Sequence, residues 1–99
     1  MPTQSLTVVV RIHAKPGKEA RTRAELQKLL APTRKEQGCL KYDLHESADD
    51  RALFLFHENW ASQGELDRHL ESAHIKAWRE ASKELLAEPL VVTLWQRIG

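Results

Sequence analysis

Residues 52–60 form the segment that most constrains the fold, with the sequence ALFLFHENW. Successive side chains of a strand point to opposite faces of a sheet, so Phe54 and Phe56 fall on one face. Leu53 and Leu55 then fall on the other. Both faces are apolar until the polar end of the segment, which indicates a strand buried on both sides. In a chain of 99 residues, helices can cover one face and a second subunit can cover the other.

Two other segments have the composition of strands. Residues 6–13, LTVVVRIH, are rich in β-branched side chains, which favour extended backbone. Residues 90–98, LVVTLWQRI, alternate in the same manner after Pro89. We expect both segments to join the sheet, with Leu94 and Trp95 on opposite faces of the second.

A third strand pairs with the apolar segment as a hairpin. Residues 39–47, CLKYDLHES, alternate between apolar and polar side chains. The connection at residues 48–51 is short and polar, so we expect an antiparallel pair. In that hairpin Leu40 and Tyr42 share a face, and a tight loop places Tyr42 roughly opposite His57.

The first helical region covers residues 18–37, which are rich in Ala, Leu, Glu, Lys and Arg. Pro32 lacks a backbone N–H group and clashes with the preceding turn, so it predicts a kink or a break into two pieces near Leu30 and Ala31. Gly38 follows the region as the predicted C-terminal cap.

The second helical region begins with two N-cap signals. Ser62 and Glu65 have the spacing of a capping box, which predicts a short helix over residues 63–71. Ser72 then predicts the start of another helix over residues 73–86, whose apolar side chains recur at helical spacing.

The order strand-helix-strand-strand-helix-strand is that of the ferredoxin-like β-α-β-β-α-β unit. It predicts an α+β protein with an antiparallel sheet and helices on one face. The other face would expose a large apolar patch, so we expect a homodimer whose sheets pack face to face. No linker or repeat divides the chain, and we predict a single domain over residues 1–99.

The charge balance disfavours some classes of partner. Lys and Arg number 15 and Asp and Glu 14, so the net charge of +1 does not favour nucleic acid or an anionic membrane. The single cysteine, Cys39, excludes an internal disulfide and is expected to pack as a small apolar side chain. No apolar run approaches the ~20 residues of a membrane span, and residues 1–10 lack the features of a secretory signal. We expect a cytoplasmic protein.

Polar side chains gather where the apolar strand ends and the next two helices begin. Glu58 and Trp60 end the strand, and His69 and His74 lie on the helices. A strand end facing a helix pair forms a concave pocket, and histidines there can exchange protons near neutral pH. Each residue also has a structural interpretation, with His69 as a partly buried side chain and Trp60 and Trp78 as core aromatics.

The spacing of His69 and His74 argues against a metal site. Ligands on one helix face are three or four residues apart, whereas these are five apart, and the cap at Ser72 places them on separate helices. The sequence contains no HExxH, no CxxC and no glycine-rich phosphate-binding motif. We therefore predict neither a metal nor a nucleotide cofactor.

Three stretches of the chain carry a family resemblance. The first comprises KPGKEA, the helix after it and the strand EQGCLKYDLHES, with a GC-x-x-Y pattern. The second is FLFHENW, in which Glu58 and Trp60 form an E-x-W strand end. The third is ELDRHLESAHIKAW, in which His69, Leu70 and His74 form an H-L-x-x-x-H pattern. In these features the chain resembles the antibiotic biosynthesis monooxygenase family, and within it the bacterial quinol monooxygenases.

The resemblance implies a ferredoxin-like fold in a dimeric α+β barrel. It implies oxygenation of a quinol- or anthrone-like aromatic by molecular oxygen without flavin, haem or metal. In that chemistry His69 or His74 would be the base that deprotonates the substrate, and Glu58 would orient the base.

Further residues would bind the substrate. Trp60 and Trp78 would line a flat ring site together with Tyr42, and Asn59 would donate a hydrogen bond to a substrate oxygen. Trp60 rests on the family motif, whereas Asn59 and Trp78 are inferred from their places in this sequence.

Two alternatives stay open. Other relatives isomerise small phosphorylated ketones, and the helix start at residues 72–74 offers a phosphate site. The same fold also suits a non-catalytic, dimeric ligand-binding module. Haem degradation is disfavoured, because Arg79 stands where the haem-degrading relatives carry their axial histidine.

Overall fold

Strand β3 (Leu53–Trp60) lies inside a four-stranded antiparallel sheet, between β2 (Cys39–Glu46) and β1 (Leu6–His13). Strand β4 (Val91–Gln96) pairs with the other side of β1, so the strand order is β2-β3-β1-β4. This computed structural model describes residues 5–99. The first four residues belong to the segment predicted to lack a secretory signal, and they lie outside the described residues.

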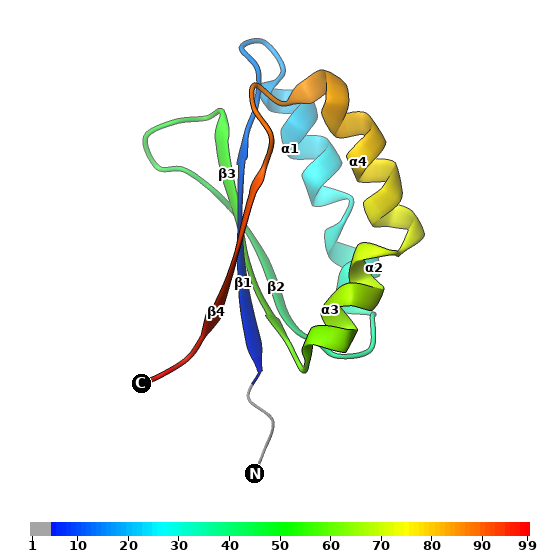
Figure 1. Ribbon diagram of the computed structural model, residues 1–99. Helices are drawn as coiled ribbons and strands as arrows, with labels where there is room; N and C mark the ends of the chain where they lie inside the picture. The colour runs from blue at the N-terminus through cyan, green and yellow to red at the C-terminus, as the bar shows by residue number, and fades with distance from the viewer. Residues whose placement is uncertain (1–4) are drawn as a thin grey trace.

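Two helices in each crossover cover one face of the sheet, and Figure 1 shows all four on the same side. Their bounds are α1 (Glu19–Gln27), α2 (Leu30–Arg34), α3 (Gln63–Leu70) and α4 (Ala73–Leu85). The long helices α1 and α4 pack against each other. The predicted α+β ferredoxin-like β-α-β-β-α-β fold, with an antiparallel sheet and helices on one face, is confirmed.

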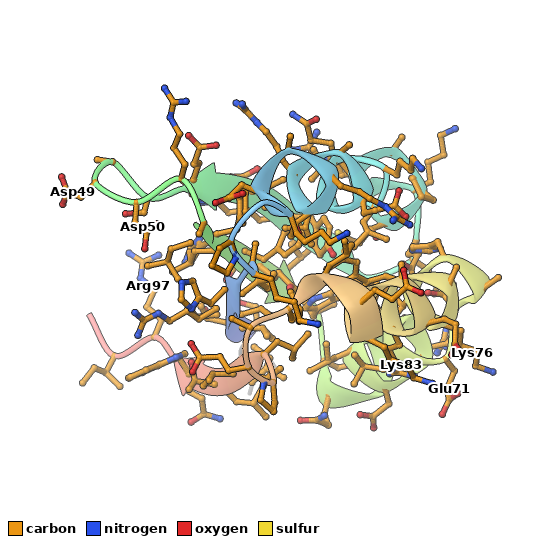
Figure 2. All side chains as sticks on the ribbon, turned by 90° about the horizontal axis from the view of Figure 1, so that it is seen from above. Asp49, Asp50, Glu71, Lys76, Lys83 and Arg97 are labelled. Atoms are coloured by element: carbon orange, nitrogen blue, oxygen red, sulfur yellow. The ribbon has the colours of Figure 1, made fainter. Side chains whose placement is uncertain are left out.

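The outer surface of α4 is charged. Glu71, just before α4, and Lys76 and Lys83 on the helix project away from the sheet, while Asp49 and Asp50 lie at the tip of the β2–β3 loop (Figure 2). None of the helices in residues 5–99 is long and apolar enough to cross a membrane.

The predicted break near Leu30 and Ala31 is confirmed, and it lies just before Leu30. Helix α1 ends at Gln27 and α2 begins at Leu30, so Pro32 lies in the first turn of α2. The first N–H groups of a helix have no intrahelical partner, so proline costs little there. Gly38 does not cap α2, whose C-cap is Lys35; it lies with φ of +84° in the turn that leads to β2.

A β-bulge corrects the predicted faces of the hairpin. The register shifts between Cys39 and Lys41, which inserts an extra residue into β2 and leaves Leu40 61% exposed. Leu40 therefore does not share the buried face with Tyr42. Tyr42 pairs with Glu58 rather than with His57.

The two faces of β3 are buried to different extents. Phe54, Phe56, Glu58 and Trp60 alternate along the helix-covered face and are almost fully buried. The side chains between them are only half-buried within one chain. The predicted burial of the first face is confirmed, and the second has no cover among residues 5–99.

The two predicted N-caps behave differently. The Ser62 hydroxyl accepts a hydrogen bond from the backbone N–H of Glu65 at 3.3 Å, which begins α3 as the capping box predicts. Ser72 is the N-cap of α4 by position but makes no capping bond. Its hydroxyl donates instead to the backbone carbonyl of His69 at 2.7 Å and so secures the corner between α3 and α4.

Gly17 and Gly38 allow a matched test of the turn that leads to β2. Both have φ near +85°, where alanine costs about 1 kcal/mol. A Cβ at Gly17 would meet nothing within 4 Å, whereas one at Gly38 would lie 2.7 Å from Glu65 Cβ. We expect Gly17→Ala to lower the free energy of unfolding by about 1 kcal/mol and Gly38→Ala by about 2 kcal/mol or more. Denaturant unfolding measures both, and equal losses would contradict the close contact.

Candidate active site

A cavity of about 450 Å³ opens between the helix-covered face of β1 and β4 and the helices α3 and α4. This volume lies in the range of small-molecule sites. The apolar side chains that line it include Val8, Val10, Ile12, Phe56, Leu66, Ile75, Trp78, Val92 and Leu94. The polar groups on its wall are Glu58, His69, Gln63, Arg79 and the phenol of Tyr42.

His69 reaches the cavity from the last turn of α3, because the apolar stripe of that helix faces the sheet. Its side chain is 3% exposed. The imidazole packs on the Trp60 indole with ring centroids 4.5 Å apart, and its edge meets the Tyr42 ring at 5.6 Å. Two aromatic side chains therefore fix the plane of the ring.

The carboxylate of Glu36 sets the proton positions on two histidines. Its Oε2 lies 2.7 Å from His69 Nδ1 and 3.0 Å from His74 Nε2. An ionised carboxylate only accepts hydrogen bonds, so His69 Nδ1 and His74 Nε2 each carry the proton. Neutral His69 then has an unprotonated Nε2, which has no hydrogen-bond partner among residues 5–99.

The surroundings of His69 keep it neutral. Burial lowers the pKa of His69, while its hydrogen bond and charge interaction with Glu36 act against that shift. Charge interactions with His74 and Arg79 also lower the pKa of His69. Near neutral pH the ring therefore offers a lone pair on Nε2, which is the form of histidine that accepts a proton.

Glu58 is the second buried titratable group on the cavity wall. Its side chain is 3% exposed, and Oε1 accepts a hydrogen bond from the Trp60 indole N–H at 2.8 Å. Burial raises the pKa of Glu58 to about 7, although the Trp60 bond opposes the shift. Tyr42 pairs with Glu58 across the sheet. Burial also raises the pKa of Tyr42, so it remains a protonated phenol.

Four of the residues predicted from the sequence surround this cavity: Glu58, His69, Trp78 and Tyr42. Three others lie elsewhere. Trp60 is fully buried behind the wall, where it supports His69 and Glu58. His74 turns to Glu36 outside the cavity.

Asn59 does not reach the cavity. It lies on the opposite face of the sheet, where its Oδ1 accepts a hydrogen bond from the Thr7 hydroxyl at 2.8 Å. Strand alternation causes this, since the neighbours Glu58 and Trp60 both face the helices. Glu58 also does not orient a histidine, because Trp60 is its side-chain partner and Glu36 is the partner of both histidines.

Two residues of the site were missed in the sequence. Glu36 lies in the turn after α2 and is 33 residues from His69, so no local spacing connects them. Arg79 follows Trp78 on α4 and is an exposed cation on the cavity wall. The sheet side of the wall follows from strand alternation, which places Phe56 and Glu58 on one face of β3.

A second depression lies at the C-terminal end of α4. Lys83, Glu88 and Pro89 are among the residues that line it, and its titratable groups are exposed. It has no buried titratable group that could bind or react with a ligand, so the cavity at His69 is the better candidate for an active site.

Comparison with known proteins identifies a family. The family model described as antibiotic biosynthesis monooxygenase matches residues 5–81. A protein of Mycobacterium tuberculosis named "Putative monooxygenase Rv0793" is 40% identical over 92 residues, which cover 93% of this chain and 90% of that protein. A protein of Escherichia coli K12 named "Probable quinol monooxygenase YgiN" is 30% identical over 90 residues, which cover 79% of this chain and 85% of that protein.

The fold is also shared with solved structures. The crystal structure of PA3566 from Pseudomonas aeruginosa superimposes with a TM-score of 0.95 at 32% sequence identity. The superposition covers 100% of this chain and 99% of that one. The architecture described above is therefore that of an experimentally known group of proteins.

The raised pKa of Glu58 predicts a pH-dependent stability. The folded pKa of about 7 lies above the ordinary value of 4.5, so between these pH values the folded state holds a proton that the unfolded state releases. The stabilisation that the Glu58 carboxyl group contributes has its full value below pH 4.5 and is lost as the pH rises through 7. We expect Glu58→Gln, which keeps an acceptor for Trp60, to be more stable than the wild type by about 3 kcal/mol above pH 7.

The measurement is denaturant unfolding of both proteins at a series of pH values. The difference between them should be smallest below pH 4.5 and should grow towards pH 7. A difference that stays constant across this range would show that the carboxyl group is not held protonated in the fold.

Proposed function

Because the chain belongs to the antibiotic biosynthesis monooxygenase family, we propose that it oxidises a quinol- or anthrone-like aromatic with molecular oxygen. The observation that carries this proposal is the pairing of Glu36 with His69 beside an apolar cavity. The carboxylate holds the Nδ1 proton, and the unprotonated Nε2 is left for a substrate. A flat aromatic suits the apolar walls formed by Phe56, Trp78 and the β1 side chains.

In the proposed reaction His69 Nε2 removes the phenolic or benzylic proton of the substrate. The resulting anion is electron-rich enough to pass an electron to oxygen, and a new C–O bond forms at the ring. One oxygen atom stays on the product and the other leaves as water. The substrate supplies all of the electrons, so we propose that no flavin, haem or metal cofactor takes part.

Two other groups have roles in this scheme. Glu58, with a pKa near 7, is suited to donate a proton to the departing oxygen and to take one back. Arg79 brings a positive charge to the cavity wall, which favours an anionic intermediate. His69 is favoured over His74 as the base, because His74 does not line the cavity.

The structure gives less support to a small phosphorylated ketone as substrate. The helix start at residues 72–74 was the candidate phosphate site. His74 there binds the Glu36 carboxylate at 3.0 Å, and a second anion at this position would be repelled. The apolar lining of the cavity also favours an aromatic ring over a phosphate ester.

We also propose that the protein is a homodimer with its sheets packed face to face. The uncovered face of the sheet carries Val9, Leu55, Val91 and Trp95, and the last two are 53% and 57% exposed. Figure 1 shows that no helix lies on this side. Apolar side chains on an open sheet face gain most by packing against a copy of themselves.

The first prediction from this proposal concerns turnover. The wild type should accelerate oxygen uptake by menadiol or anthrone over the uncatalysed rate. His69→Gln should lower kcat/KM by about 100-fold or more, because it removes the base. His45→Gln is the matched control, since His45 is exposed on β2 away from the cavity.

An oxygen electrode measures these rates. Unchanged turnover in His69→Gln would eliminate the base assignment. Binding of flat aromatics with no turnover would favour a ligand-binding module. Oxygen-independent conversion of a phosphorylated ketone, inhibited by inorganic phosphate, would favour an isomerase.

A second prediction concerns assembly. Sedimentation equilibrium should give a dimer mass for the wild type and a shift towards the monomer for Trp95→Glu, because the charge would be buried in the apolar interface. Trp95 is exposed in a single chain, so its loss should leave the chain folded. Lys76→Glu on the outer surface of α4 is the control (Figure 2). A monomeric wild type would contradict the dimer.

A further inference from the structure

Three potential metal ligands converge beside the cavity. Glu36, His69 and His74 each offer one ligand atom, and these atoms lie within 4.8 Å of one another. Glu36 Oε2 contacts His69 Nδ1 and His74 Nε2 directly. They come from three backbone segments, which are the turn after α2, the end of α3 and the first turn of α4. We propose that these three atoms form a binding site for one divalent transition-metal ion, with Zn²⁺ as the reference ion.

The distances suit such an ion after small side-chain movements. Zinc binds imidazole nitrogen and carboxylate oxygen at about 2.0–2.2 Å, so two ligand atoms at the tetrahedral angle are about 3.4 Å apart. Glu36 Oε2 already lies 2.7 Å from His69 Nδ1 and 3.0 Å from His74 Nε2. The Thr33 hydroxyl, 2.9 Å from His74 Nε2, is placed to add an oxygen.

The donor set selects the class of ion. Two imidazoles and one carboxylate suit zinc and its first-row neighbours. Calcium and magnesium require more oxygen ligands than this cluster supplies. The cluster is also accessible, because the side chains of Glu36 and His74 are 19% and 21% exposed and neither lines the cavity. An ion can therefore reach it without entering the substrate cavity.

Metal binding would change the proton on the other nitrogen of His69. Without metal, Nδ1 carries the proton and Nε2 is an acceptor, as the Glu36 contact requires. A metal on Nδ1 displaces that proton, and the neutral imidazole then carries its proton on Nε2. The nitrogen at the cavity thus changes from an acceptor to a donor. If His69 is the base, as the proposed function holds, the ion is an inhibitor rather than a cofactor.

The experiment is a calorimetric titration of the metal-free protein with Zn²⁺ in the absence of substrate. We expect one ion per chain and at least tenfold weaker binding for His74→Ala. Glu36→Gln, which keeps the size of the side chain, should weaken binding similarly. Mg²⁺ should produce no comparable heat.

The control is His13→Ala, which should bind Zn²⁺ as the wild type does. His13 also lies beside two carboxylates, at 3.0 Å from Glu88 and 4.0 Å from Asp50, but these three side chains form an exposed cluster on the surface. Absence of Zn²⁺ binding, or equal binding by the wild type and His74→Ala, would overturn the site.

A spectroscopic readout separates this inference from the proposed function. In ¹H–¹⁵N spectra of histidine-labelled protein, Zn²⁺ should place a proton on His69 Nε2 and remove the one on Nδ1. This signature needs no turnover, so it can appear even if menadiol and anthrone are not substrates. Where turnover is observed, Zn²⁺ should suppress it in the wild type and suppress it at least tenfold less effectively in His74→Ala. Full turnover in the Zn²⁺-loaded wild type would overturn the inhibitory role.

Discussion

The Glu36 carboxylate is the contact on which the arrangement of the site depends. One of its oxygens accepts hydrogen bonds from His69 at the end of α3 and from His74 at the start of α4. The Ser72 hydroxyl secures the same corner by donating to the carbonyl of His69. Because a carboxylate can only accept, this one interaction sets both the orientation and the proton position of the His69 ring. The chemistry available in the cavity follows from that.

Burial shifts the pKa values of His69 and Glu58, the two buried titratable groups on the cavity wall that can exchange a proton near neutral pH. Removal from water disfavours the charged form of each group, so the pKa of His69 falls and that of Glu58 rises to about 7. Both groups are therefore able to exchange a proton near neutral pH without a permanent charge in an apolar pocket. Trp60 links them, since its indole N–H donates to Glu58 and its ring packs on His69. Acid and base in one site are typically set apart by their environments in this manner.

Much of the fold could be predicted because it depends on local periodicity. The alternation of β3, the break in the first helical region and the cap at Ser62 were all predicted from neighbouring residues and are present in the structure. One failure occurred where strands pair. The bulge beside Leu40 shifts the register of the hairpin, and it arises from the fit of two strands rather than from the pattern of one. Asn59 was expected near the substrate, although strand alternation already placed its side chain on the other face of the sheet from Glu58.

Local sequence patterns were sufficient to predict the ferredoxin-like order of elements, the apolar faces of the sheet, and His69 and Glu58 as candidates for a site. These follow from periods of two and 3.6 residues, which act over short distances along the chain. The carboxylate that contacts His69 is set by tertiary packing. Glu36 and Glu58 are both close to the site, but Glu58 is bound to Trp60, while the packing of α2 against the sheet brings Glu36 to both histidines. A contact across 33 residues depends on how the elements pack, and no spacing within the sequence records it.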